Sequence, residues 1–586
     1  MTNNPMKELK YAAILKENQR LGEALKEERP YRIAVLSNVT VNQIKEILEY
    51  SLRLNNINAE TRFGEYNTIV QDSAKYNNLD LIVIFWEASN LVAGGQYKTV
   101  LMDEKEISAL IGRVRDEMEL VFKNLKNSSL VLMNLFSSLL FNNWNLQSNN
   151  FDTVCAALNE HIELNKPPNT LLVDIVNVIA KISVEKAYDS RFFYSSKALY
   201  TIDFYKEYVR QILPALLSAN GQAKKALVFD CDNTLWKGIL GEDGIDKIAM
   251  SSQTPEGAVF EEVQSLALGL AKNGVLLGLC SKNNPQDVDE VLFSNQHMKI
   301  RDKDLVIKKV NWDDKVTNLK AIAQELNIGL DSIVFVDDSN FEVNMIRDNL
   351  PQVTVLQVPS RLSEYPGLLR EHLGLFFSRS RTAEDLKKIE MYKAQASRQN
   401  ERAKFHTLEE YLSSLEMKIN MHVNALKFVP RIAQLTQKTN QFNLATKRYT
   451  ETDIEEFIRS TESRVICFEV SDKFSDNGIV GVAIILLHDQ HAEIDTFLMS
   501  CRVIGRNVEF AVFNWIVKYL KRLNVQTVLS TYCETLKNGQ VKDFYEGIGF
   551  LLTEVSEKTK MYKADINSLK TNNLNYLEVT GGRAAD

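Results

Sequence analysis

Residues 226–234 read Ala226-Leu-Val-Phe-Asp-Cys-Asp-Asn-Thr234, an apolar run that ends in two carboxylates. A short apolar run bounded by polar residues predicts a buried strand of a parallel sheet. Asp230 and Asp232 then lie at the carboxyl end of that strand, the edge at which α/β folds bind ligands. One carboxylate there can attack phosphorus, and the other can act as general acid and then as general base. The stretch therefore predicts phosphoryl chemistry at a sheet edge.

Further polar residues follow apolar runs in the order that this chemistry requires. Ser281 ends one run and can hydrogen-bond a phosphoryl group. Lys315 offers a fixed positive charge for the phosphoryl oxygens and for the attacking carboxylate. Asp337 and Asp338 close another run and supply the hard oxygen ligands that Mg²⁺ prefers. We therefore predict a Mg²⁺ site with the ligands Asp230, Asp232, Asp337 and Asp338.

In this order the motifs resemble those of the haloacid dehalogenase superfamily. The resemblance implies that Asp230 is the nucleophile and Asp232 the acid and base, with Ser281 and Lys315 completing the catalytic set. We also predict that the substrate phosphate is bound by Asn233, Thr234, Lys282 and Asn283. The segments between these motifs are too short for a separate cap domain, so we expect a site that is open at its rim or covered by flanking domains.

Three longer runs, at 227–238, 280–283 and 432–443, resemble FkbH-like proteins. That resemblance covers nearly the whole chain. It implies loading of a three-carbon glyceryl unit from 1,3-bisphosphoglycerate onto the phosphopantetheine thiol of an acyl carrier protein, with loss of phosphate. The setting would be biosynthesis of a natural product or a surface glycan. The partners expected are an acyl-phosphate donor and a separate carrier protein, because no carrier attachment site is recognisable in this chain.

Cys231 lies between the two catalytic carboxylates, and the resemblance makes it the expected acceptor of the acyl group. Neighbouring carboxylates raise the pKa of a thiol, so bound Mg²⁺ or Lys315 would have to offset them. The alternative is that Cys231 is a small buried residue. The enzyme would then be a Mg²⁺-dependent phosphohydrolase of a small phosphoester.

Alternating apolar runs and amphipathic stretches predict an α/β multidomain protein. We expect a flavodoxin- or SGNH-like α/β domain, a haloacid-dehalogenase-like Rossmannoid domain, and a GNAT-like α+β domain with an antiparallel meander. The predicted boundaries are an N-terminal helical segment at 1–31, the SGNH-like domain at 32–220, the catalytic domain at 221–380, a helical connector at 381–404, the GNAT-like domain at 405–570 and a disordered tail at 571–586.

The N-terminal region loosely resembles SGNH hydrolases, with Ser37 at the end of its first strand and Asn134 after a later one. Those enzymes need a late Asp-x-x-His pair. The nearest candidate, Asp189-Ser-Arg-Phe192, has Phe where the His belongs, so nothing activates Ser37. We expect a docking or lid domain in preference to an esterase.

The C-terminal region resembles GNAT acyltransferases in its run Arg502-Val-Ile-Gly-Arg-Asn507 and around Tyr545. Backbone N–H groups at a helix N-terminus can bind pyrophosphate, but Asn507 stands where a small residue is usual and crowds a diphosphate. We predict that Arg502, Gly505, Asn507 and Tyr545 bind the pantetheine of a carrier protein. A GNAT-type transferase that uses acyl-coenzyme A, and a domain kept only for packing, are the alternatives.

The composition limits the classes of binding partner that we expect. The formal net charge is -7, and no block of Lys or Arg suggests nucleic acid or an anionic membrane. The 6 cysteines are widely spaced, and we interpret them as reduced thiols. No apolar run approaches the roughly 18 residues that span a bilayer. We therefore expect a cytoplasmic enzyme without nucleic-acid or membrane partners.

Overall fold

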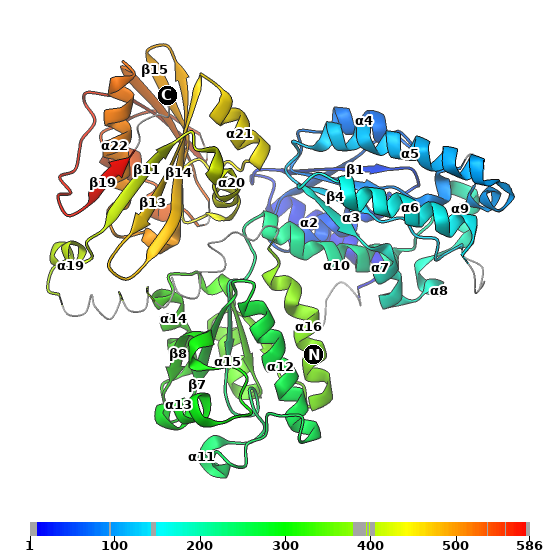
Figure 1. Cartoon of the computed structure of the whole chain (residues 1–586), viewed down its shortest axis with the longest axis horizontal. Coiled ribbons are helices and arrows are strands. Elements are labelled where there is room, and N and C mark those ends of the chain that lie inside the picture. The colour runs from blue at the N-terminus through cyan, green and yellow to red at the C-terminus, as the bar shows by residue number, and fades with distance from the viewer. Residues whose placement is uncertain are drawn as a thin grey trace. The chain divides into compact units, whose positions relative to one another are not determined.

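The computed structural model describes residues 9–92, 95–141, 148–378, 394, 398, 405–535, 537–556 and 558–581 (Figure 1). The chain divides into two compact units, residues 2–217 and the residues from 218 onward. The first unit holds one sheet, and the second holds two sheets with separate apolar cores. The predicted α/β multidomain class is confirmed. The predicted connector at 381–404 lies outside the described residues except for Ala394 and Arg398.

A parallel five-stranded sheet organises the first unit, with the strand order β2-β1-β3-β4-β5 of flavodoxin-like folds. Its strands are β1 (Tyr31–Ser37), β2 (Ala59–Phe63), β3 (Leu81–Phe85), β4 (Val131–Asn134) and β5 (Thr170–Val173). Its helices are α2 (Tyr11–Ala24), α3 (Ile44–Arg53), α4 (Ile69–Lys75), α5 (Glu104–Leu125), α6 (Asn150–Asn165), α7 (Ile175–Ile182), α8 (Val184–Ala187), α9 (Ser190–Ser196) and α10 (Ile202–Ala219).

From residue 9 onward, the predicted N-terminal helical segment packs within this unit, because α2 lies against α3 and buries Ile14 completely. Helices α4, α5 and α6 are neighbours and form a layer on the sheet. Helix α5 is amphipathic: Ile107, Val114 and Met118 recur at helical spacing on its buried side. Each strand is therefore covered by helices, as a parallel sheet requires.

A second parallel sheet, with the order β10-β9-β6-β7-β8, forms the central domain. Its strands are β6 (Ala226–Phe229), β7 (Leu276–Ser281), β8 (Leu305–Val310), β9 (Ile333–Asp337) and β10 (Thr354–Gln357). Its helices are α11 (Leu240–Asp243), α12 (Pro255–Ala271), α13 (Pro285–Ser294), α14 (Lys315–Glu325), α15 (Asn340–Asn349) and α16 (Tyr365–His372). Strands β6, β7 and β9 are the apolar runs that end at Asp230, Ser281 and Asp337, as the sequence predicted.

Strand β6 lies at the centre of this sheet, between β7 and β9. Its side chains alternate between two cores: Leu227 and Phe229 join one apolar cluster, and Ala226 and Val228 join the other. The chain runs from β6 to β7 on one side and reaches β9 on the other. A crevice at the carboxyl end of β6 is therefore the expected ligand site of this domain.

The third sheet is mixed and mostly antiparallel, with the order β17-β18-β16-β15-β14-β13-β11-β19. Its strands are β11 (Lys418–Val423), β13 (Ser463–Ser471), β14 (Asp476–His488), β15 (His491–Met499), β16 (Thr527–Cys533), β17 (Leu551–Val555), β18 (Thr559–Asp565) and β19 (Glu578–Gly581), and β12 (Phe442–Asn443) pairs with β15. Its helices are α19 (Leu408–Ser414), α20 (Val429–Lys438), α21 (Glu451–Arg459), α22 (Val508–Arg522) and α23 (Phe544–Gly547). The predicted meander is the antiparallel series β13-β14-β15.

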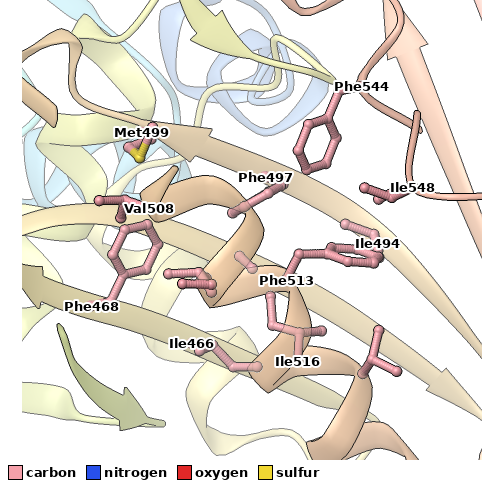
Figure 2. Packing of buried hydrophobic residues seen from close by; sticks show 14 of the residues in the cluster. Ile466, Phe468, Ile494, Phe497, Met499, Val508, Phe513, Ile516, Phe544 and Ile548 are labelled. Atoms are coloured by element: carbon pink, nitrogen blue, oxygen red, sulfur yellow. The ribbon is translucent and has the colours of Figure 1, made fainter. Parts of the chain in front are cut away.

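Helix α22 supplies the core on one face of this sheet. Figure 2 shows Val508, Phe513 and Ile516 of α22 above Ile466 and Phe468 of β13. Helices α20 and α21 cover the opposite face in a second apolar cluster. The sheet is thus sandwiched between helices.

One prediction about this domain was wrong. The segment 571–586 was expected to be disordered, but Glu578–Gly581 is strand β19 and pairs in parallel with β11. The N–H of Glu578 donates to the carbonyl of Met417 (3.1 Å), and Leu577 is buried. Backbone pairing at the sheet edge orders residues 578–581 although their sequence carries little apolar pattern, and residues 582–586 lie outside the described residues. Among the described residues, no helix is long and apolar enough to cross a membrane.

Candidate active site

The predicted catalytic residues meet where three neighbouring strands end. Asp230 follows β6, Ser281 is the last residue of β7 and Asp337 is the last residue of β9. The N–H of Asp230 donates to the carbonyl of Val336 (2.9 Å), which ties the first carboxylate to the neighbouring strand. Parallel strands end at the same edge of the sheet, so residues 107 positions apart in the sequence come together there.

Three carboxylates form a group that suits a metal ion. One oxygen each from Asp230, Asp337 and Asp338 lies within 4.8 Å of the others. Burial, and then the negative charge of Asp230, raise the pKa of Asp337 to about 6 and also raise the pKa of Asp338. A divalent cation would relieve this repulsion, and an all-oxygen set suits Mg²⁺. The residues present therefore fit the metal predicted from the sequence.

Lys315 supplies positive charge to the same group. Its Nζ lies 2.9 Å from Asp230 Oδ1 and 2.7 Å from Asp337 Oδ2, and all three side chains are buried. Burial alone lowers the pKa of Lys315, but the carboxylates of Asp230 and Asp337 outweigh it and raise the pKa overall. Lys315 is the first residue of α14, after the N-cap Asp314 whose side chain accepts from the N–H of Thr317. This N-cap fixes the first residue of α14, and it therefore fixes the backbone position from which the Lys315 side chain extends to the carboxylates.

Asp232 lies beside the acidic group but is not part of it. Its Oδ1 accepts from Trp236 Nε1 (3.0 Å) and from the N–H of Leu240 (3.0 Å), while its Oδ2 accepts from Asn283 Nδ2 (2.8 Å). The acidic group contains the carboxylates of Asp230, Asp337 and Asp338 but not that of Asp232, and metal binding by Asp232 stays a prediction. Burial raises its pKa, and the three donors oppose that rise.

Cys231 is enclosed by the domain core. Its side chain is fully buried in the apolar cluster that contains Leu227 and Phe229. Burial, followed by the charge of Asp230, raises the pKa of the thiol well above its usual value, although a hydrogen bond with Ser281 lowers it in part. Because the thiolate is the nucleophile, a thiol held in this way is a poor one. The acyl-acceptor role of Cys231 stays a prediction.

The residues predicted to bind phosphate have other partners. Lys282 Nζ pairs with Glu342 Oε1 (2.7 Å), and Asn233 Oδ1 accepts from the N–H of Gly238 (3.1 Å). Asn283 holds Asp232, as described above. Thr234 differs: it is fully buried, and its Oγ1 has no hydrogen-bond partner in the described part of the chain. Phosphate binding by these four residues stays a prediction.

The rim of the crevice is built from short segments. Residues 234–315, all described, contain the helices α11, α12 and α13 and the strands β7 and β8. Helix α12 packs in the core under the sheet, with Phe260 and Val263 fully buried. No separate cap sheet or cap bundle occurs within 234–315, as the sequence predicted.

The N-terminal unit has a polar cluster at the carboxyl edge of its sheet. Ser37 Oγ donates to the backbone carbonyls of Val39 (2.7 Å) and Phe85 (3.0 Å), and Asp189 pairs with Arg191. Asn134 Oδ1 accepts from Tyr208 Oη (2.9 Å). Ser37 is thus bound to backbone rather than to a base. The docking or lid role of this unit stays a prediction.

Glu87 lies in the same unit and was not singled out from the sequence. It is buried, and its Oε1 accepts from Tyr200 Oη (2.9 Å). Burial raises the pKa of Glu87 to about 8, and the tyrosine hydrogen bond opposes that rise. The carboxyl group is therefore mostly protonated at neutral pH.

In the C-terminal domain, residues of the predicted pantetheine-binding loop form hydrogen bonds and an ion pair with other residues of the domain. Asn507 has a left-handed backbone (φ 60°), and its Nδ2 donates to Tyr576 Oη (2.6 Å). Arg506 is buried against Asp472 (3.1 Å), and burial lowers its pKa to about 10. Arg502 is buried, Gly505 also has positive φ (79°), and Tyr545 is a core residue that is 1% exposed. Pantetheine binding by these residues stays a prediction.

Comparisons with known proteins bear on the fold. No protein-family model matches the chain, and no curated protein matches it. One solved structure is the N-terminal part of the protein BF1531 from Bacteroides fragilis, described as containing a phosphatase domain complexed with Mg. It is 24% identical, the likeness covers 62% of this chain and 99% of that one, and the TM-score is 0.54. At this identity the likeness establishes a shared fold.

Acetyltransferases match a smaller part of the chain. A mutant of spermidine N-acetyltransferase SpeG from Vibrio cholerae is 15% identical over 25% of this chain and 94% of its own, with a TM-score of 0.21. The ribosomal-protein-S18-alanine N-acetyltransferase from Escherichia coli is 13% identical over 27% and 98%, also with a TM-score of 0.21. At such scores neither likeness carries an argument about this chain.

Several residues of the site escaped the sequence analysis. Trp236 and Leu240 hold Asp232, and the spacing of Trp236 four residues after Asp232 was the available signal. Glu342 pairs with Lys282, which lies 60 residues earlier in the sequence, and the local sequence does not predict that contact. Tyr365 Oη donates to the carbonyl of Thr234 (3.1 Å) from a helix far along the chain.

Proposed function

We propose that the central domain is a Mg²⁺-dependent enzyme of the haloacid dehalogenase type that transfers a phosphoryl group through Asp230. The observation that carries the proposal is the Asp230–Lys315–Asp337 group, in which a buried lysine lies within 2.9 Å of both carboxylates. The shared fold with a phosphatase domain that was crystallised with Mg supports it. A buried lysine whose charge is fixed between carboxylates is costly unless it serves a site.

In the first step Asp230 attacks phosphorus. An O–P bond forms as the bond from phosphorus to the leaving oxygen breaks, and Asp232 gives its proton to that oxygen. Water then attacks the aspartyl phosphate, Asp232 takes the proton of the water, and phosphate leaves as Asp230 is regenerated. Trp236, Leu240 and Asn283 orient Asp232 for both transfers.

Lys315 holds the Asp230 carboxylate in an ion pair of 2.9 Å, and Ser281, the last residue of the neighbouring strand, contacts the phosphoryl oxygens. Bound Mg²⁺, held by Asp230, Asp337 and Asp338, would neutralise charge on the phosphoryl group. The short rim formed by residues 234–315 favours a substrate that projects a phosphoryl group into the crevice from a larger body.

The test is a turnover assay of the full chain with acetyl phosphate and Mg²⁺, read by phosphate release and by intact-mass spectrometry. We expect Asp230→Asn to lower turnover by at least about 10³-fold. Asp232→Asn should accumulate a phosphoryl adduct that peptide mapping places on Asp230. The matched control is Asp313→Asn, an exposed carboxylate near the same site. Normal turnover by Asp230→Asn, or an adduct on another residue, would overturn the proposal.

A second candidate is the finer activity that the FkbH resemblance implies, glyceryl transfer from 1,3-bisphosphoglycerate to the phosphopantetheine thiol of a separate acyl carrier protein. The observation that favours it is the hydrogen bond between Cys231 and Ser281, because Ser281 ends β7 and is a predicted catalytic residue. The sulfur would attack the acyl carbon and the bond from that carbon to the C1 phosphate oxygen would break, so that phosphate leaves with the thiol proton and a 3-phosphoglyceryl thioester remains. Transfer of the C3 phosphoryl group to Asp230 and its hydrolysis by water would then give the glyceryl thioester and a second phosphate. The carrier thiolate would then take the acyl group by thioester exchange.

Burial is the argument against this second candidate, since Cys231 has no exposed surface. Cys231→Ala separates the two candidates: phosphoryl transfer through Asp230 survives the substitution, whereas glyceryl loading through the thiol is lost. A glyceryl adduct on Cys231 after incubation with Mg²⁺ and 1,3-bisphosphoglycerate would favour the transferase. Acyl-coenzyme A transfer by the C-terminal domain is favoured less, because Asn507 and Arg506 are already engaged.

A further inference from the structure

Residues 231–235 form a tight turn directly after the proposed nucleophile. The N–H groups of Thr234 and Leu235 both donate to the carbonyl of the first residue of the turn, at 3.1 and 2.8 Å. The turn leads into Trp236, whose indole Nε1 donates to Asp232 Oδ1 (3.0 Å). The orientation of the proposed acid and base therefore depends on where this turn places Trp236.

The last two carbonyls of the turn accept from buried side chains that lie far away in the sequence. Tyr365 Oη, from α16, donates to the carbonyl of Thr234 (3.1 Å), and Gln264 Nε2, from α12, donates to the carbonyl of Leu235 (2.8 Å). Both side chains are fully buried, and the two helices that carry them are neighbours. The end of the turn is therefore fixed by two helices of the domain.

The amide of Gln264 connects the turn to a second segment. Its Oε1 accepts from the N–H groups of Lys299 (2.7 Å) and Ile300 (3.1 Å), which precede β8. A buried amide is costly unless it forms hydrogen bonds, and here its nitrogen and its oxygen both do. An apolar side chain could fill the same space, but it would leave the Leu235 carbonyl without this donor.

Tyr365 is suited to act as a lasting donor. Burial, followed by the charge of Asp230, raises the pKa of Tyr365 well above its usual value, so the hydroxyl keeps its proton. The ring packs edge to face on Phe260 of α12, with centroids 6.2 Å apart. This packing fixes the direction from which the hydroxyl approaches the Thr234 carbonyl.

We propose that Tyr365 and Gln264 are positioning residues for phosphoryl transfer. They fix the end of the 231–235 turn, and the turn holds Trp236 where its indole orients Asp232. The assignment rests on the phosphoryl transfer proposed for the central domain. Both side chains are fully buried, so they act through the backbone of the turn and do not touch substrate. Misplacing a catalytic group by about 1 Å can lower a rate by about 10²-fold, so loss of either anchor should slow turnover.

The experiment measures kcat and KM of the full chain for acetyl phosphate with Mg²⁺, in the variants Tyr365→Phe and Gln264→Met. We expect each substitution to lower kcat at least about tenfold and to change KM less than about twofold, because neither residue contacts substrate. A phosphoryl adduct on Asp230 should accumulate, since Asp232 activates the water that hydrolyses it. The matched control is Tyr208→Phe, which removes an equally buried tyrosine hydroxyl from the N-terminal unit and should leave kcat unchanged.

A double-mutant cycle tests the route through the indole. Trp236→Phe keeps an aromatic ring but removes the donor, and in that background Tyr365→Phe should lower kcat less than about threefold. Circular dichroism melting shows whether each variant is folded at the assay temperature; if Gln264→Met is not, Tyr365→Phe carries the test. Additive losses of kcat in the cycle, or losses no larger than the unfolded fraction explains, would overturn the assignment.

The positioning roles and the proposed function can fail separately. A parent chain that releases no phosphate from acetyl phosphate refutes phosphoryl transfer and the positioning roles together. A parent chain that turns over, with Tyr365→Phe and Gln264→Met both matching it in kcat, refutes the positioning roles alone.

Discussion

Cys231 follows Phe229 by two positions, and both side chains enter the same apolar cluster. The residue between the two aspartates therefore packs in the core, although β6 itself ends at Phe229. The sequence identified Cys231 as chemically unusual, but its surroundings make it a poor thiolate. The same rule explains why Asp337 could be placed at the site from sequence: it extends a fully buried strand by one residue.

We expect Glu87 to make the stability of the folded protein depend on pH. Its pKa is about 8 in the folded chain and about 4.3 in an unfolded one, so the folded state retains a proton between these values. This contribution to stability is full below about pH 4, and it is lost progressively as the pH rises to about 8. The slope is at most about 1.4 kcal/mol per pH unit. We predict that Glu87→Gln unfolds at a higher temperature than the parent at pH 7 to 8, and that the difference shrinks toward pH 4.

Differential scanning calorimetry of the full chain across this pH range checks the prediction, with attention to the transition of the 2–217 unit. Glu104→Gln, which changes an exposed carboxylate in the first turn of α5, is the control and should give a pH-independent difference near zero. A Glu87→Gln variant whose difference from the parent stays constant with pH would show that Glu87 is ionised in the folded chain.

Among the elements, those with continuous apolar runs were predictable and those held by backbone pairing alone were not. Ala226–Phe229, Leu305–Val310 and Ile333–Asp337 are strands because each run buries both faces in a parallel sheet. Strand β19 reads Glu-Val-Thr-Gly, which has a single apolar residue and no period. Its position is decided by the free edge of β11, which offers donors and acceptors to any chain that reaches it.

This edge pairing can be tested at Glu578, whose N–H donates to the carbonyl of Met417. Glu578→Pro removes that donor, and we expect a loss of about 1 to 2 kcal/mol in the stability of the C-terminal domain. Hydrogen exchange should show reduced protection in peptides from Lys418–Val423. Glu578→Ala keeps the N–H and is the matched control; if both variants lose protection equally, the side chain of Glu578 holds the edge and the backbone pair does not.

At the scale of the molecule, the chain consists of two compact units, and the acidic group belongs entirely to the second. A ligand that binds only the folded state stabilises the unit that contains its site. We predict that Mg²⁺ at 100 times its Kd stabilises the unit from residue 218 onward by about 2.7 kcal/mol and leaves the 2–217 unit unchanged. Removal of the metal with a chelator should reverse the effect.

Hydrogen exchange with and without Mg²⁺ measures this effect by region. Peptides from β6 and β9 should gain protection, and those from β1 and β3 should not. Asp337→Asn should abolish the gain, whereas Asp313→Asn, which removes an exposed carboxylate, should keep it. An equal gain in the Asp337→Asn protein would place the bound metal elsewhere.

The sequence by itself determined the α/β class, the strands of the central sheet and the residues that end them, because apolar periodicity and the position of carboxylates after a strand are local properties of the chain. The tertiary structure alone decided that the Asp232 carboxylate accepts hydrogen bonds from Trp236 and Asn283, that Lys282 pairs with Glu342, and that Cys231 is enclosed. It also decided that residues 578–581 close a sheet edge. Those outcomes depend on which distant groups meet in space. The sequence around Asp230 thus marks where the chemistry takes place, and the fold determines which of its side chains are free to take part.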